Sequence, residues 1–151
     1  MTAVTKDLPI GYEFPPVNYL MTLERMTVYS DMETTASNDL GRKLVLARKN
    51  IHNSPEYAKS HGLPAPIADG VITTAWVEAE LREMFGRGYL RGGKIATKYL
   101  KPVFAGDTVT IKMTLKEKIP QGSATRFVLD ISCFNQKGDL LTVGSGGGLV
   151  E

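Results

Sequence analysis

The hydrophobic pattern of this chain changes from a helical period to a period of two near residue 86, and this change limits the folds that it can adopt. Residues 71–85 carry apolar side chains at helical spacing. Five of them fall within roughly 140° of arc, namely Val71, Ile72, Ala75, Trp76 and Ala79. The apolar stripe then moves to another side of the helix at residues 81–85, which predicts that other structure surrounds it. Gly86 and Gly88 follow, as helix ends prefer.

Four strand candidates follow the helix, at residues 94–100, 109–115, 127–133 and 140–143. The second and third alternate apolar and polar residues, as strands with one face in water do. Turn sequences at residues 119–122 and 136–139 separate the last three candidates. We therefore predict an α+β fold in which four successive strands form an antiparallel meander that curls around a long central α-helix.

The N-terminal part of the chain is less regular. Residues 1–16 are polar, end in two prolines and are expected to form an arm, followed by a single domain over residues 17–151. A short strand is predicted at residues 17–20 and a helix at residues 23–32. The residues expected on the buried side of this helix are Leu23, Met26, Val28 and Tyr29.

The segment before the central helix has the composition of loops. Residues 33–43 offer turn-forming side chains and little core, and residues 44–47 are compatible with a short helix or a strand. Residues 49–70 form a long connection with a helical turn near residues 54–58. A connection of this length is uncommon in a compact domain unless it has a function.

Composition argues against several classes of protein. The net charge of +2 over 151 residues is too small to indicate nucleic-acid binding. No apolar run approaches the roughly 20 residues of a membrane helix. The N-terminus lacks the basic and apolar regions of a signal peptide. Cys133 is the only cysteine, so it forms no internal disulfide, and we expect it to be a small buried residue. These features predict a cytoplasmic protein without nucleic-acid or membrane partners.

The long connection also carries the residues with the clearest chemical potential. His52, one of two histidines, lies in a polar, turn-forming stretch. Asp69 and Gly70 stand where the central helix begins; Asp is a preferred N-cap, and Gly lets another molecule approach the backbone closely. A histidine beside a helix N-terminus with free N–H groups is suited to stabilise a developing oxyanion.

Three stretches resemble the MaoC-like dehydratase family, which includes (R)-specific enoyl-CoA hydratases and has the hotdog fold. Together the resemblance spans about residues 18–150. The stretches are Asn50-Ile51-His52 with Pro55-Glu56-Tyr57-Ala58, then Pro66-Ile67-Ala68-Asp69-Gly70, and Tyr99-Leu100-Lys101-Pro102-Val103 with Ala105-Gly106-Asp107. The second is similar to the family's Pro-Ile-Ala-His-Gly entry into the central helix, and the third to its strand with aromatic-x-x-Pro-Val and a Gly-Asp turn.

The resemblance implies hydration of a trans-2-enoyl thioester, or the reverse dehydration. In the family an Asp and a His share a catalytic water, and a Gly amide holds the thioester oxygen; the His matches His52 and the Gly matches Gly70. The position of the family's Asp is occupied here by Ala47, and Asn53 and Asp69 also depart from the pattern. Loss of a positioned general base costs about 10²–10⁴-fold in rate. A replacement carboxylate is sought at Asp69, Asp31, Glu33, Asp39 or in a second subunit.

Each site residue also has a purely structural interpretation. His52 is either an acid/base residue or a loop residue bonded to backbone. Asp69 is either catalytic or only an N-cap, and the Gly70 amide is either an oxyanion donor or a place of tight packing. The remaining predicted substrate-binding residues are Asn50, Asn53, Ile67, Trp76, Lys94 and Lys98. Among these, Trp76 has core packing as its alternative, and the two lysines, with Arg87 and Arg91, have a solvated basic face.

We predict a hydro-lyase that acts on an enoyl or 3-hydroxyacyl thioester. Coenzyme A or a carrier phosphopantetheine is expected as part of the substrate, with no separate cofactor and no metal. The resemblance implies a homodimer or a heterodimer with another hotdog subunit. Two alternatives stay open: a weakly active or non-catalytic subunit that binds the acyl chain for a catalytic partner, and a hotdog protein with different chemistry in a biosynthetic pathway.

Overall fold

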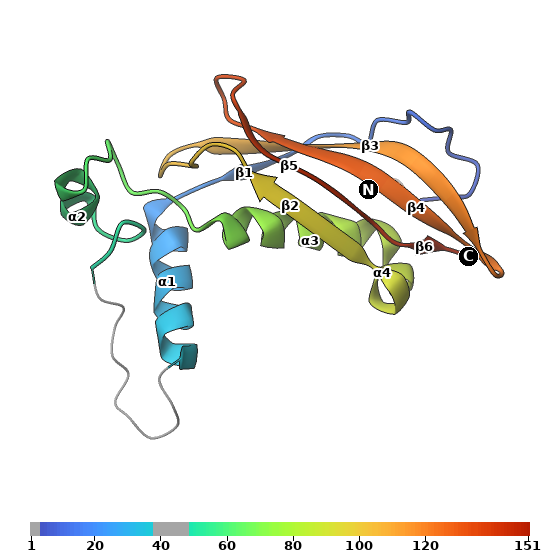
Figure 1. The fold of residues 1–151 in the computed structure, drawn as a ribbon, viewed down its shortest axis with the longest axis horizontal. Helices are drawn as coiled ribbons and strands as arrows, with labels where there is room; N and C mark the ends of the chain where they lie inside the picture. Colours follow the sequence, from blue (N-terminus) through green and yellow to red (C-terminus); the bar gives the residue numbers. More distant parts are fainter. Residues whose placement is uncertain (1–3, 38–48) are drawn as a thin grey trace.

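The computed structural model describes residues 4–37 and 49–151 and contains a mixed helix and sheet architecture (Figure 1). In chain order the elements are β1 (Val17–Leu20), α1 (Leu23–Ser37), α2 (Pro55–Ser60), α3 (Gly70–Phe85), α4 (Arg87–Gly92), β2 (Lys94–Tyr99), β3 (Thr108–Gln121), β4 (Ala124–Phe134), β5 (Leu140–Gly147) and β6 (Leu149–Val150). No helix within these ranges is long and apolar enough to cross a membrane.

The sheet has the strand order β1-β3-β4-β5-β2, and its pairs are antiparallel, with β6 added beside β4. The predicted fold class is confirmed: the sheet curves over α3, which lies along its concave side (Figure 1). The predicted meander of four successive strands is wrong in one respect, because β2 pairs with β5 and not with β3. Residues 100–107 carry the chain from that edge to β3, and the amide of Leu100 is held by the carbonyl of Leu141 at 2.8 Å.

The core lies between α3 and the sheet. The alternation predicted for β3 is confirmed, since Val109, Ile111, Met113 and Leu115 are at most 5% exposed. From α3 the buried apolar side chains are those of Ile72, Val77, Leu81 and Phe85. The predicted stripe is therefore only partly correct. Val71 is 48% exposed, and Ala75 and Ala79 are also exposed, because the face centred on residues 77 and 81 is the one that meets the sheet.

Helix α1 extends away from the sheet (Figure 1) and is longer than predicted, because residues 33–37 continue it rather than forming a loop. Met26 is buried as expected, but Val28 is 52% exposed. The two residues are about 200° apart on a helix, so one face cannot bury both. The predictions for residues 38–43 and 44–47 lie outside the described residues.

Two boundaries in the second half differ from the sequence prediction. Strand β3 continues to Gln121, with Ile119 and Pro120 paired to Arg126 and Thr125 of β4, so the predicted turn begins too early. Gly122 has a left-handed φ of 62°, which lets a short turn reverse the chain and leaves the preceding residues free to pair. The short helix α4 was not predicted. The turn at residues 136–139 and the strand β1 are confirmed.

The segment before β1 lies along the outer part of β3. The amides of Gly11 and Phe14 donate to the carbonyls of Leu115 and Met113 at 2.7 and 3.0 Å. Phe14 is 8% exposed and belongs to the core. The N-terminal segment therefore covers one edge of the space between α3 and the sheet.

Candidate functional site

The loop that carries His52 is organised by two asparagine side chains. Asn50 Oδ1 accepts hydrogen bonds from the amides of His52 and Asn53 at 2.8 and 3.2 Å. Asn53 Oδ1 accepts from the amide of Asn50 at 2.8 Å. Such Asx turns fix a loop in one conformation. Asn50 Nδ2 also donates to Ser30 Oγ in α1 at 3.0 Å, so both asparagines act here as loop supports.

The imidazole of His52 is held by the backbone that leads into α3. Its Nδ1 lies 2.7 Å from the carbonyl oxygen of Ile67, and the amide of Ile67 donates to the carbonyl of Ile51. A carbonyl oxygen only accepts, so Nδ1 carries the proton in the neutral ring and Nε2 keeps its lone pair. The hydrogen bond to backbone predicted by the structural interpretation is present, and it leaves Nε2 available as a hydrogen-bond acceptor.

The segment that leads into α3 is held by backbone hydrogen bonds and ends in an N-cap residue. The amide of Ala68 donates to the carbonyl of Val103 at 2.7 Å, and Ile67 forms an isolated bridge with Phe104. Asp69 is the N-cap, and its Oδ1 accepts from the amide of Val71 at 2.9 Å. Within the described part of the chain, the Gly70 amide has no hydrogen-bond acceptor. The N-terminal dipole of α3 therefore directs an unpaired N–H outward, three residues after the carbonyl that orients His52.

A cavity of about 260 Å³ lies beside Gly70. Its lining residues are Ala68, Gly70, Thr73, Tyr99, Leu100, Lys101, Pro102, Val103 and Thr142. The Tyr99 hydroxyl hydrogen-bonds Thr74 Oγ1 at 2.6 Å, which keeps the ring at the cavity wall. Thr73 is 1% exposed, and its hydroxyl has no partner among the described residues. The Thr73 hydroxyl is therefore a polar group in the cavity wall that forms no hydrogen bond with the described residues.

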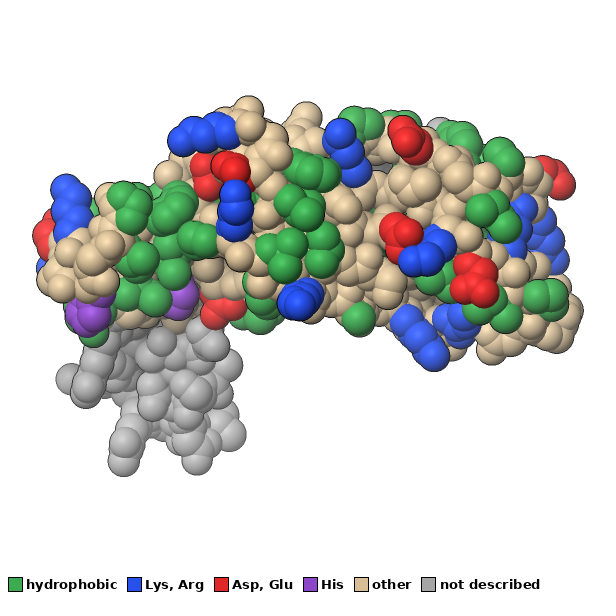
Figure 2. All heavy atoms as spheres, turned by 45° about the horizontal axis from the view of Figure 1, so that its top comes forward, with side chains coloured by type: hydrophobic (Ala, Val, Ile, Leu, Met, Phe, Trp, Pro, Cys, Tyr) green, Lys and Arg blue, Asp and Glu red, His purple; other side chains and the backbone are tan. Residues whose placement is uncertain are grey.

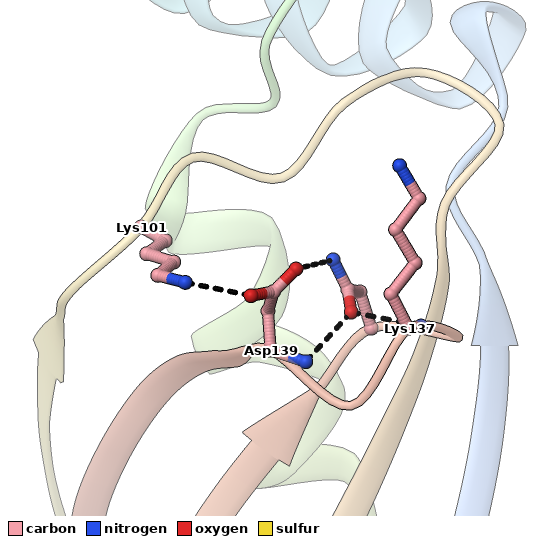
Figure 3. A network of polar contacts seen from close by, with 4 residues as sticks. Lys101, Lys137 and Asp139 are labelled. Atoms are coloured by element: carbon pink, nitrogen blue, oxygen red, sulfur yellow. Dashed lines mark hydrogen bonds and ion pairs between the residues drawn. The ribbon is translucent and has the colours of Figure 1, made fainter.

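Lys101, one of the lining residues, forms an ion pair with Asp139 of the β4–β5 turn (Figure 3). Lys101 Nζ lies 2.7 Å from Asp139 Oδ1, and Asn135 Nδ2 donates to Asp139 Oδ2 at 3.0 Å. The hydrogen bond from Lys101, followed by that from Asn135, lowers the pKa of Asp139 below its ordinary value. The segment after β2 is thereby attached to the β4–β5 turn, so Lys101 is engaged in support of the wall.

The structure places other predicted site residues elsewhere. Trp76 stacks on Tyr19, with ring centroids 4.8 Å apart, in a different cavity between α3 and α1. Lys94 and Lys98 are exposed on β2 and alternate with Ile95 and Thr97, of which Thr97 bonds Thr74 of α3 at 2.8 Å. The two lysines therefore point away from α3 and from the Gly70 cavity.

The two histidines lie at the end of the molecule that carries α2, as the purple side chains in Figure 2 show. His61 Nδ1 bonds the carbonyl of Tyr57 at 2.9 Å, and the residue is exposed. Within the described ranges, no group of three His, Cys, Asp or Glu residues lies in an arrangement that could hold a metal ion. The position of Ala47 lies outside the described residues.

Sequence reasoning missed Thr73 and Tyr99 as parts of the site. Tyr99 stood in the motif that supported the family resemblance, but nothing in the spacing indicated that its ring packs on Gly70. Thr73 follows Gly70 by three residues and so lies on the same side of the helix, and that spacing was an available signal. Its burial without a partner is visible only in three dimensions.

Residues 48–129 match the family described as the MaoC like domain, and the chain belongs to this family. The solved (R)-hydratase PhaJ1 from Pseudomonas aeruginosa is similar with a TM-score of 0.71 and 17% identity, covering 93% of this chain and 80% of that one. The (R)-hydratase from A. caviae involved in PHA biosynthesis gives 0.70 and 16%, covering 94% and 96%. The ChsH1–ChsH2 complex from Mycobacterium tuberculosis gives 0.67 and 15%, covering 94% and 97%.

No curated protein sequence matches the chain significantly. At these identities the structural likeness shows the hotdog fold, and the family match adds membership of the MaoC-like domain family.

Proposed function

We propose that the protein is a hydro-lyase that adds water to an enoyl thioester, or removes it from a 3-hydroxyacyl thioester. The observation that carries the proposal is the contact of 2.7 Å between His52 Nδ1 and the Ile67 carbonyl oxygen, which holds the ring on the segment that leads to Gly70 and leaves Nε2 with a free lone pair. Family membership supports the class of reaction.

In hydration, His52 Nε2 takes a proton from water as the water oxygen bonds to Cβ of the enoyl group. The electrons of the double bond move toward the thioester oxygen, and the Gly70 N–H stabilises the resulting enolate. The imidazolium then returns the same proton to Cα. One H and one OH are added, and the enzyme regains its starting state.

The carboxylate that orients water in the family has no counterpart at Ala47, so this chain needs another one or works slowly. Asp69 is occupied as the N-cap of α3, which argues for a structural role. Ser30 of α1 contacts Asn50 of the His52 loop, and the next residue is Asp31. Asp31 is therefore the first carboxylate to test as the water-orienting group.

The substrate is proposed to be an acyl group on coenzyme A or on a carrier phosphopantetheine, without a further cofactor, in the cytoplasm. Lys94 and Lys98 lie on the outer face of the edge strand β2. From this face the two lysines can contact a phosphate group of either carrier only where that group lies outside the cavity. The lysines are thus proposed to contact the carrier end of the substrate rather than the reacting atoms.

A second hotdog subunit is proposed to cover the exposed side of α3. Val71, Ala75 and Ala79 form an exposed apolar row there. Beside it, α1 adds Val28 and Met32, which are 52% and 66% exposed. The structurally similar ChsH1–ChsH2 protein is a complex of two chains. Binding of a catalytic partner to this face can be measured. Such binding would test the second candidate function, an acyl-binding subunit for a catalytic partner.

The deciding experiment is hydration of crotonyl-CoA and of a longer, branched enoyl-CoA, followed by loss of enoyl absorbance. Wild type, His52→Ala, Asp31→Asn and His61→Ala are compared as purified proteins. His61 is the matched control, because it is the other histidine of the same segment but is exposed and bonded to α2. We expect His52→Ala to lose at least about 10²-fold in rate, and His61→Ala to keep the wild-type rate.

Equal rates for His52→Ala and wild type overturn the assigned role of His52. Absence of turnover by wild type with either substrate overturns the stand-alone hydratase. In that case, turnover that appears only with an added MaoC-like partner supports the acyl-binding subunit.

A further inference from the structure

A buried carboxylate in the C-terminal half of α3 has no role in the proposed reaction. Glu80 is 7% exposed and lines a cavity of about 400 Å³. The other lining residues are Phe14, Pro15, Val17, Met84, Ile111 and Met113. Glu80 is thus the sole charged residue among these lining residues, and the others are apolar. The volume of the cavity lies within the size range of small-molecule sites, about 300–1,000 Å³.

This cavity is separate from the one at Gly70. Its walls come from the segment before β1, from β1 and from β3, at one edge of the sheet. The Gly70 cavity is bounded by Tyr99 of β2 and Thr142 of β5, at the other edge. Helix α3 lies between the two, with Gly70 at its start and Glu80 in its C-terminal half.

Within the described part of the chain, Glu80 has a single hydrogen-bond partner. The hydroxyl of Tyr19 in β1 donates to Glu80 Oε1 through a short contact. Burial and then this hydrogen bond raise the pKa of Tyr19 to about 12, so the hydroxyl keeps its proton. Glu80 Oε2 has no partner among the described residues.

Arg25, a cation on the facing helix α1, is engaged elsewhere. Arg25 Nη1 donates to the carbonyl oxygen of Leu20, and its guanidinium lies over the ring of Trp76, 5.9 Å from the centroid. A carboxylate accepts several hydrogen bonds, and Glu80 receives one from the described residues, so it has capacity for a further donor. A ligand in the cavity can bring this second donor.

We propose that the cavity lined by Glu80 binds a small molecule with an apolar body and one hydrogen-bond donor, an amine or a hydroxyl, that pairs with Glu80 Oε2. The apolar side chains of Phe14, Met84 and Met113 contact the body of the ligand. Molecules without a donor leave the carboxylate unpaired, and molecules with a carboxylate of their own are repelled, so the site excludes both.

The test uses four probes of similar size with the full-length protein: hexylamine, 1-hexanol, 1-methoxypentane and hexanoate. Binding is followed by NMR of ¹³C-labelled methionine methyl groups, because Met84 and Met113 line this cavity. We expect hexylamine and 1-hexanol to shift both resonances at concentrations at least about tenfold below those needed for the other two probes, as unpaired buried polar groups discriminate strongly. Equal affinities of all four probes, or no shift at Met84 and Met113, overturn the proposal.

Variants locate the interaction at Glu80. Glu80→Gln is expected to weaken hexylamine at least about tenfold because the negative charge is removed, and an unchanged affinity in this variant overturns the proposal. Tyr19→Phe keeps the carboxylate and is expected to retain hexylamine binding. If Glu80→Gln does not fold, the ranking of the four probes with wild type decides. His52→Ala is expected to leave the binding unchanged, so the outcome is independent of the proposed hydratase.

Discussion

The ring of Tyr99 packs directly on Gly70, so that a Cβ at residue 70 would come within 2.6 Å of ring carbons. The Tyr99 hydroxyl is bonded to Thr74 Oγ1 one turn further along α3. Glycine is needed at this helix start because an aromatic side chain of the edge strand occupies the space. The same packing keeps the ring at the wall of the cavity that Gly70 also lines.

Gly70→Ala is therefore expected to displace the Tyr99 ring and to break its hydrogen bond with Thr74. The expected loss in unfolding free energy is about 1 kcal/mol, the usual value of one such bond, measured by urea denaturation. The double variant Gly70→Ala/Tyr99→Ala provides the control, because its cost should be smaller than the sum of the single costs. Strict additivity of the two substitutions would contradict the contact.

Asn50→Ala is expected to destabilise the His52 loop. The change removes the acceptor for the amides of His52 and Asn53 and the donor to Ser30. We expect a loss of about 1–3 kcal/mol and a hydration rate reduced together with it, because His52 is no longer held beside α3. Asn50→Asp keeps the acceptor oxygens and should retain most of the stability. Equal urea midpoints for Asn50→Ala and wild type would show that the turn forms without this side chain.

Thr73→Val is expected to stabilise the protein. The Thr73 hydroxyl is buried without a partner among the described residues, and valine has nearly the same shape without the polar atom. The expected gain is about 1 kcal/mol, seen as a higher urea midpoint with an unchanged slope. Thr73→Ser keeps the hydroxyl and loses the methyl group, so it should be less stable than wild type. A loss of stability in Thr73→Val would mean that the hydroxyl is paired in solution.

Cys133 is expected to be inert in the folded protein. It is fully buried on β4, as the sequence predicted, and burial raises the pKa of its thiol to about 12. Only the thiolate reacts readily with alkylating agents. Mass spectrometry after iodoacetamide treatment at pH 8 should show no modification of the native protein and one modification in urea. Modification of the native protein at the rate seen in urea would contradict this packing.

The regular parts of the fold could be predicted because each has a local pattern. The alternation around Val109 and Phe127 fixes which face of the sheet is buried, and Asp69 with Gly86 marks the ends of α3. The position of β2 beside β5 could not be predicted, because it depends on where the irregular residues 100–107 cross the sheet. The exposure of Val71 could not be predicted either, since the hydrophobic pattern does not say which surface covers each residue.

The candidate site shows the same division. Residue types and the family resemblance indicated His52, Asp69 and Gly70, and the structure gives Asp69 the N-cap role foreseen from its place in the chain. The other features of the site could not be predicted from a local pattern. The contact of His52 with Ile67 and the packing of Tyr99 on Gly70 join separate segments of the chain. The lack of a partner for the Thr73 hydroxyl depends on its burial. The placement of Trp76 in another cavity follows from its stacking on Tyr19, which no local pattern encodes.

The hydrogen bond between Tyr19 and Glu80 makes a specific pH dependence expected at high pH. The pKa of Tyr19 rises from the ordinary value of 10.0 to about 12 in the folded protein. A raised pKa of an acid means that its neutral form is favoured by folding, so this contribution to stability is complete below pH 10 and is lost as the pH rises from 10 to about 12.

Tyr19→Phe removes this contribution and serves as the reference. The difference in unfolding free energy between wild type and Tyr19→Phe should be constant from pH 7 to 9 and should shift against wild type by pH 11. Tyr89, whose pKa burial also raises, is present in both proteins and cancels in the difference. Absorbance of tyrosinate should show one group fewer titrating above pH 11 in Tyr19→Phe than in wild type. A difference in stability that stays the same at pH 8 and pH 11 would mean that Tyr19 is not held as a donor to Glu80.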